Sequence, residues 1–190
     1  MNAKAKDYVK TITLSAMFLA LGMALPFVTG YVPMIGKMLL PMHIPVLLCG
    51  LICGWQWGAA VGLVCPLLRH VIFQMPPMLD AIGMTFELCT YGAVVGFLYA
   101  RSKWKCVRAL YRSLLIAMVS GRVVWALVRM VMMGAGAREF GRQAFVAGAL
   151  TQAIPGIILQ LTLIPVIMIA LDRAKLVPFS RTRPAQSAEN

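Results

Sequence analysis

The sequence predicts an all-α integral membrane protein, a bundle of six transmembrane helices with both termini in the cytoplasm. Of its 190 residues, 61% are hydrophobic and only 13% are charged, whereas a soluble domain has roughly 25% charged residues. Uncharged runs extend over residues 11–36, 38–68 and 143–171, and each exceeds the roughly 20 apolar residues that cross a bilayer. The lipid bilayer is therefore the expected surrounding of most of the chain.

Basic residues indicate how the helices are oriented. They precede the first apolar run, flank a middle loop and follow the last run, at Lys4, Lys6, Lys10, Arg101, Lys103, Lys105, Arg108, Arg112, Arg173, Lys175, Arg181 and Arg183. Such residues favour the cytoplasmic side of short loops, so an even number of crossings would put 12 of the 18 basic residues there. Topology thus accounts for the net charge of +12, and nucleic acid is not an expected partner.

The apolar runs divide into six helices with a short segment before and after them. We expect a cytoplasmic N-terminal segment over 1–10, a transmembrane domain over 11–171 and a basic, polar cytoplasmic tail over 172–190. The second and third helices are short and interrupted by prolines, which membranes tolerate where a helix packs on protein or faces a cavity. The segment 69–78 is expected to be a loop or partly re-entrant. Helices are predicted over residues 11–28, 40–53, 57–68, 79–100, 110–133 and 145–171.

Three charged side chains fall inside the predicted helices, away from the helix ends. They are Glu87, on the fourth helix, and Arg122 and Arg129, on the fifth. Ionisable groups are costly in a membrane and are functional candidates by default. The two arginines are seven residues apart and so share one helix face, while Thr90 and Tyr91 extend a polar stripe from Glu87.

The proposed topology brings further polar groups to a similar depth. Trp125 lies close to the face of the two arginines, and Gln152 and Gln160 are the main polar groups of the last helix. We expect these groups to converge on a site open to the outside. The expected substrate-binding residues are Glu87, Tyr91, Arg122, Trp125, Arg129 and Gln152.

Two interpretations of the charges stay open. In one, Glu87 pairs with an arginine and locks two helices together. In the other, the two arginines leave a surplus positive charge over one glutamate, and an anionic ligand satisfies it, since arginine suits bidentate binding of a carboxylate. Arg69 and His70, near the outer surface, either attract the same anion or cap that surface.

The sequence lacks the motifs of several enzyme classes. It has no G-x-x-x-x-G-K-[ST] loop, so the chain is not expected to hydrolyse ATP itself, and it has no G-x-S-x-G or H-E-x-x-H motif. We predict no enzymatic activity, no cofactor and no metal site. Copper(I) binding by Met34, Met38 and Met42 beside His43 is a minor alternative, because methionine more often fills apolar space.

Small residues and the order of the helices carry a family resemblance. Ala16, Ala20 and Ala24 repeat every four residues, which gives a smooth face for close helix approach. Three further features accompany this face: the six-helix layout and the segments LLPMHIPVLLCGLICGWQWGAAVGLVCPLL (39–68) and AIPGIILQLTLIP (153–165). With these features the chain resembles the S components of energy-coupling factor (ECF) vitamin transporters. The resemblance covers roughly residues 11–171.

The resemblance implies a function and a set of partners. The alanine face would dock on a membrane T component, driven by two cytoplasmic ATPases that bind the ATP. The substrate would be a vitamin or related micronutrient, bound near the outer side of the cell membrane by the last three helices. A carboxylate-bearing vitamin such as pantothenate or folate fits the arginines. The alternatives are a stand-alone secondary transporter or small channel for an organic anion, with Glu87 carrying a proton, and a membrane scaffold.

Overall fold

The computed structural model describes residues 3–29, 41–102, 106–133 and 154–174, which contain helices and no strand. Five of these helices are long and apolar enough to cross a membrane, and α3 is shorter, with 11 residues. The prediction of an all-helical membrane bundle is therefore confirmed, with five long spans and one short apolar helix. In chain order the helices are α1 Ala3–Thr29, α3 His43–Cys53, α4 Trp55–Phe73, α5 Met78–Arg101, α6 Val107–Met133 and α8 Ile154–Arg173.

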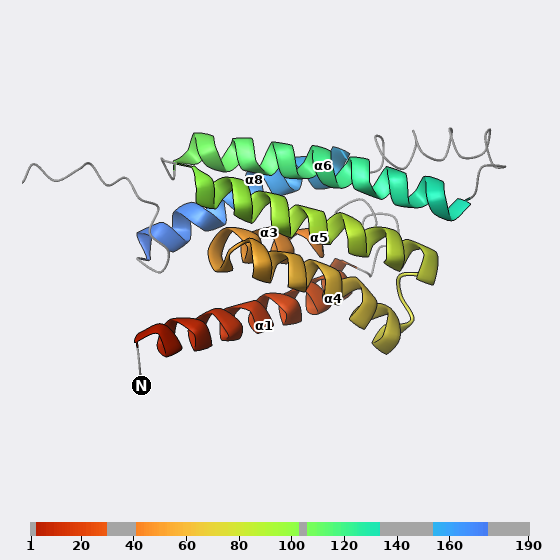
Figure 1. The fold of residues 1–190 in the computed structure, drawn as a ribbon, viewed down its shortest axis with the longest axis horizontal. Coiled ribbons are helices and arrows are strands. Elements are labelled where there is room, and N and C mark those ends of the chain that lie inside the picture. The colour runs from red at the N-terminus through yellow and green to blue at the C-terminus, as the bar shows by residue number, and fades with distance from the viewer. Residues whose placement is uncertain (1–2, 30–40, 103–105, 134–153, 175–190) are drawn as a thin grey trace, which may run out of the picture.

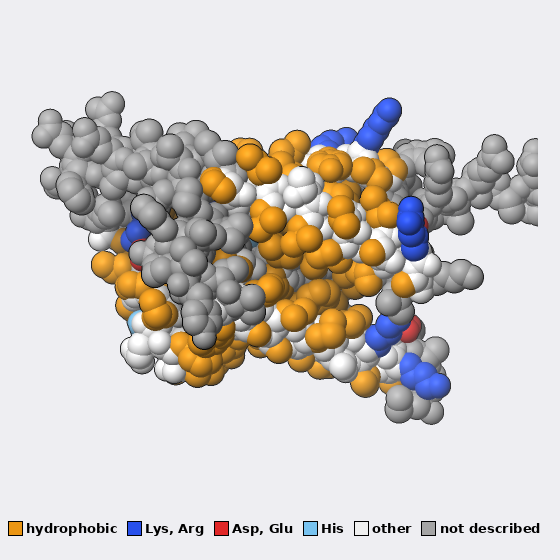
Figure 2. Space-filling model, turned by 180° about the vertical axis from the view of Figure 1, so that it is seen from behind, with side chains coloured by type: hydrophobic (Ala, Val, Ile, Leu, Met, Phe, Trp, Pro, Cys, Tyr) orange, Lys and Arg blue, Asp and Glu red, His pale blue; other side chains and the backbone are white. Residues whose placement is uncertain are grey.

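The long helices lie side by side, with α1, α4 and α6 running in one direction along the bundle and α5 and α8 in the other (Figure 1). The start of α1, the end of α5, the start of α6 and the end of α8 all lie at one end of the bundle. Hydrophobic side chains cover the middle of the face in Figure 2, and most of the visible Lys and Arg side chains lie at one end. Exposed basic residues at the helix ends that meet there are Lys6, Lys10, Arg101, Arg108, Arg112 and Arg173.

The short helix α3 forms the centre of the core. Every residue from His43 to Leu51 is buried, and the helix contacts α1, α4, α5 and α8. A helix that is apolar all round is stable when other protein surrounds it. Its first residue, His43, therefore lies inside the bundle, and not at its surface.

Glycines bring α3, α4 and α5 into backbone contact. Gly58 and Gly62 on α4, and Gly92 and Gly96 on α5, are each spaced by four residues. A Cβ atom on Gly58 would lie 2.6 Å from the Cα of Gly50 on α3 and 2.8 Å from the carbonyl oxygen of Gly92. No side chain fits at that distance, and small residues are what allow membrane helices to approach so closely. The three helices thus form a tightly packed block.

The first helix begins earlier than the sequence predicted. We expected a separate segment over residues 1–10, whereas α1 starts at Ala3. Residues 5–10 are exposed on this helix, and lysine is a good helix former. The helix can therefore extend over the basic residues without burying their charges.

The segment 69–78, expected to be a loop or partly re-entrant, is helical as far as Phe73 and again from Met78. The prediction is therefore confirmed for residues 74–77 and wrong for residues 69–73. Pro66 inside α4 removes one backbone hydrogen bond but does not end the helix. Arg69 does not need a loop to satisfy its charge, because its Nη1 donates to the carbonyl oxygen of Met23 on α1, at 2.8 Å.

The ends of the remaining helices agree with the sequence to within a few residues. The second predicted helix begins at His43 instead of residue 40, and the fifth begins at Val107 instead of residue 110. The last helix was predicted over 145–171. Its described part runs to Arg173, and residues 145–153 lie outside the described residues.

Candidate functional site

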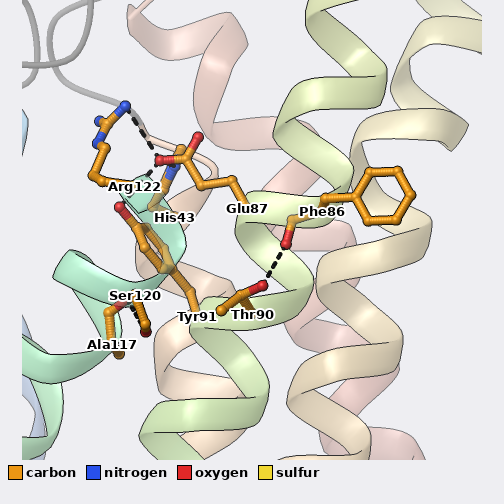
Figure 3. A network of polar contacts seen from close by, with 8 residues as sticks. All are labelled: His43, Phe86, Glu87, Thr90, Tyr91, Ala117, Ser120 and Arg122. Carbon is orange, nitrogen blue, oxygen red and sulfur yellow. Dashed lines mark hydrogen bonds and ion pairs between the residues drawn. The ribbon is translucent and has the colours of Figure 1, made fainter. Parts of the chain in front are cut away.

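The buried carboxylate of Glu87 on α5 is the centre of a polar cluster between α3, α5 and α6 (Figure 3). Its Oε1 lies 3.2 Å from Nη1 of Arg122 on α6. The hydroxyl of Tyr91, one turn along α5, donates a hydrogen bond of 3.1 Å to the same oxygen. Only 1% of Glu87 is exposed, and a charge so buried needs such partners. The interpretation that Glu87 pairs with one arginine is confirmed.

A histidine from α3 completes the cluster. Nε2 of His43 lies 3.7 Å from Oε1 of Glu87, and the imidazole meets the ring of Tyr91 edge-on, with centroids 5.2 Å apart. His43 is fully buried, yet neither ring nitrogen has a hydrogen-bond partner among the described residues. From the sequence, His43 stood out only as a neighbour of methionines. The signal that could have found it is a histidine inside an apolar membrane segment.

Arg122 uses only one side of its guanidinium within the cluster. Nη1 faces Glu87, while Nε and Nη2 are buried and have no hydrogen-bond partner in the described part of the chain. Nε and Nη2 form one edge of the planar group, and their N–H bonds run nearly parallel, which is the geometry that binds both oxygens of a carboxylate. Burying an unpaired donor costs about 1–3 kcal/mol, so a ligand that pairs with this edge recovers that cost.

Arg129 does not join the cluster. Its Nη2 lies 2.6 Å from Oδ1 of Asp80, near the start of α5, and these side chains are 24% and 44% exposed. Its guanidinium also lies over the ring of Trp125, 5.5 Å from the centroid. The expected surplus of positive charge was therefore wrong. Asp80, which was not counted among the groups in the membrane, neutralises Arg129, and Glu87 neutralises Arg122.

The two ion pairs have the same register on the antiparallel helices. Asp80 and Glu87 are seven residues apart on α5, and their partners Arg129 and Arg122 are seven apart on α6. Seven residues are two helical turns, or about 10 Å along the axis. Asp80 and Arg129 lie toward the end of the bundle where α5 starts and α6 ends, and Glu87 and Arg122 lie two turns deeper.

The glutamines and Thr90 have different positions. Gln152 lies outside the described residues. Gln160 on α8 is 1% exposed, and neither its side-chain oxygen nor its nitrogen has a hydrogen-bond partner within the described ranges. The hydroxyl of Thr90 donates to the carbonyl oxygen of Phe86 in its own helix, at 2.8 Å. Of the polar stripe expected on this helix, Glu87 and Tyr91 therefore join the cluster and Thr90 does not.

Arg69 and His70 bind groups of the protein. Arg69, besides its bond to α1, lies against the rings of Phe27 and Phe73, at 4.9 and 5.8 Å from their centroids. Nδ1 of His70 lies 2.8 Å from the carbonyl oxygen of Pro76, in the connection to α5. These contacts favour the interpretation that the two residues cap the surface.

The alanine face of α1 points away from the bundle. Ala16, Ala20 and Ala24 are all exposed, whereas Phe18 and Gly22, on other sides of the helix, are buried. A small-residue face that its own chain leaves uncovered is suited to a second membrane helix.

Within the described residues, no three His, Cys, Asp or Glu side chains are placed to hold a metal ion.

A comparison with protein families identifies the chain. The family described as ECF transporter, substrate-specific component, matches residues 10–168. The chain belongs to this family. No curated protein and no solved structure matches it. This S component is thus an integral protein of the plasma membrane and a subunit of a transporter.

Proposed function

We propose that this S component captures a small carboxylic acid, a vitamin or related micronutrient such as pantothenate or folate. It delivers the acid through a membrane T component driven by two separate ATPases. Family membership supports the role of substrate-specific subunit. The observation that carries the substrate class is the buried, unpartnered Nε–Nη2 edge of Arg122, which suits a carboxylate.

The proposed orientation has both termini in the cytoplasm and six membrane segments, α3 being the short one. The exposed basic residues at one end of the bundle support it, because basic residues favour the cytoplasmic side. The opposite end, with Asp80 and Arg129, is then outside. A ligand entering from there passes this pair before it reaches Arg122 and Glu87.

The other proposed ligand contacts follow from this path. Tyr91 touches Glu87, and it contributes an aromatic ring to the cluster that holds Arg122. Trp125 and Arg129 lie nearer the outside and would cover the bound ligand. Gln152 stays a contact proposed from the sequence alone.

Ligand binding tests the substrate class directly. Equilibrium binding of radiolabelled pantothenate and folate is measured on the purified protein, with panthenol, in which an alcohol replaces the carboxylate of pantothenate, as the matched neutral compound. We expect an acid to bind and Arg122→Gln to weaken its affinity at least tenfold, since a charge-assisted hydrogen bond contributes about 1.5–3 kcal/mol. Arg129→Gln is the control and should change the affinity less. Equal binding of pantothenate and panthenol, or no binding of any acid, would contradict the proposal.

A further inference from the structure

Gly121 of α6 lies directly against the ring of Tyr91 on α5. A Cβ atom on Gly121 would overlap the Cδ1 and Cε1 atoms of that ring, and it would lie 3.2 Å from the carbonyl oxygen of Glu87. Gly121 is buried and immediately precedes Arg122 in the chain. Figure 3 shows the ring next to the turn of α6 that carries Ser120 and Arg122. The absence of a side chain at Gly121 is therefore what leaves space for the Tyr91 ring.

Two helices besides its own contact the Tyr91 ring. His43 on α3 meets it edge-on, with centroids 5.2 Å apart, and Gly121 on α6 lies against its ring atoms. Only 1% of Tyr91 is exposed. Because protein interiors are close-packed, a ring so enclosed has little room to move. A methyl group at position 121 must therefore displace the ring or push α6 away from α5.

The position of the ring decides where its hydroxyl lies. This hydroxyl donates to Oε1 of Glu87 at 3.1 Å, and Nη1 of Arg122 lies 3.2 Å from the same oxygen. Hydrogen bonds weaken steeply as their distance and angle change. A displaced hydroxyl would therefore release Glu87, and the guanidinium that pairs with this carboxylate would move as well. A chain of contacts thus joins Gly121 to the guanidinium of Arg122.

We propose that Gly121 is a positioning residue of the acid-binding site. Its missing side chain places the Tyr91 ring so that the hydroxyl and Glu87 set the direction of the Nε–Nη2 edge of Arg122. That edge is buried and has no hydrogen-bond partner among the described residues, and a binding group must be held to within about 0.5 Å of its working geometry. This inference rests on the proposed function, because it requires that an acid binds at this edge. In this role Gly121 acts only through Tyr91.

A packing role alone would give a different result. Gly96 on α5 is a glycine of that kind, because a Cβ atom there would lie 2.6 Å from the carbonyl oxygen of Gly50 and 2.7 Å from the backbone of Trp55. Gly96 is nine residues from Glu87, or about 13 Å along the helix. Gly96→Ala should therefore lower the melting temperature without changing the affinity for an acid. It is the matched control for Gly121→Ala.

Equilibrium binding of radiolabelled pantothenate and folate to the purified chain tests the proposal. We expect Gly121→Ala to weaken the affinity about tenfold, close to the contribution of one hydrogen bond to a charged group. Tyr91→Phe, which removes only the hydroxyl, should weaken it to a similar extent. Both changes break the same chain of contacts, so the double variant should bind no more weakly than the weaker of the two single variants.

A second background keeps the proposal testable if Gly121→Ala alone does not fold. In Tyr91→Ala the ring is absent, so a methyl group at position 121 meets no ring atom. Gly121→Ala should fold in this background and should add no further loss of affinity. A further loss there would show that Gly121 acts on the site by another route, and it would overturn the proposal.

The outcomes separate this inference from the proposed function. An affinity of Gly121→Ala equal to that of the unaltered chain, or an equal loss in Gly96→Ala, overturns the positioning role and leaves acid binding standing. Losses that multiply in the double variant with Tyr91→Phe are independent of each other, and they overturn the chain of contacts. Failure of both acids to bind to the unaltered chain overturns the proposed function and, with it, this inference.

Discussion

Arg122 of α6 and Glu87 of α5 form an ion pair of 3.2 Å in which the carboxylate side chain is 2% exposed and the guanidinium side chain 16%. The pair ties together two helices that pack along much of their length, and it leaves one edge of the guanidinium unbonded. The same two residues therefore serve packing and, on our proposal, ligand recognition. Their two roles can be separated by comparing stability with binding.

Removal of one partner of this pair should destabilise the protein strongly. Arg122→Met leaves the carboxylate of Glu87 buried without its cation, and breaking a buried pair in this way costs about 3–5 kcal/mol. The double variant Glu87→Gln, Arg122→Met removes both charges and should recover most of that loss. Thermal unfolding of the detergent-purified proteins, followed by intrinsic fluorescence, compares them. A double variant no more stable than Arg122→Met would show that the ion pair is not the source of the loss.

The outer ion pair should matter much less to stability. Asp80 and Arg129 are partly exposed, and exposed pairs contribute about 0–1 kcal/mol. Asp80→Asn and Arg129→Gln should each lower the free energy of unfolding by no more than about this amount. The same unfolding assay at low and high salt measures it. A loss as large as that of Arg122→Met would mean that the outer pair is buried in the protein's native membrane environment.

The sequence predicted most of the fold because membrane helices follow from apolar length. The ends of α5 and α6 were predicted to within a few residues, because charged residues mark the limits of these two apolar segments. The error at 69–73 arose because two prolines and two basic side chains within 69–78 indicate a loop in general, whereas Arg69 here donates to a carbonyl oxygen on another helix. Such a long-range partner cannot be read from local sequence.

The candidate site was predicted only in part, for a similar reason. Glu87 and Arg122 stood out as charges in apolar segments, and the structure joins them. His43 was missed because its role depends on α3 beginning inside the bundle, beside Glu87. Asp80 was missed because it lies near a helix end, where charge is unremarkable, and only the register of α5 against α6 brings it to Arg129.

The glycine contacts of α5 give a second test of packing within one helix. A Cβ atom on Gly92 would collide with the backbone of Gly58 on α4, whereas one on Gly83 would meet only the side chains of Trp125 and Arg129, at 3.4 Å or more. Gly92→Ala should therefore reduce the melting temperature, and overpacking typically costs about 1–3 kcal/mol. Gly83→Ala should be neutral or stabilising, because alanine has the higher helix propensity. Equal melting temperatures for the two variants would show that α4 and α5 are farther apart than the structure has them.

The exposed alanine face of α1 provides the test of coupling. Ala20→Leu adds bulk where we propose that the T component docks, so it should abolish co-purification with that partner and ATP-driven uptake in proteoliposomes containing the whole transporter. Ligand binding by the isolated chain should stay unchanged, because Ala20 lies outside the bundle. Ala60→Leu on α4 is the matched control, since Ala60 is also exposed, and it should keep both activities. If Ala20→Leu supports normal uptake, the docking face is elsewhere. Uptake by this chain alone, without T component and ATPases, would instead favour a stand-alone transporter.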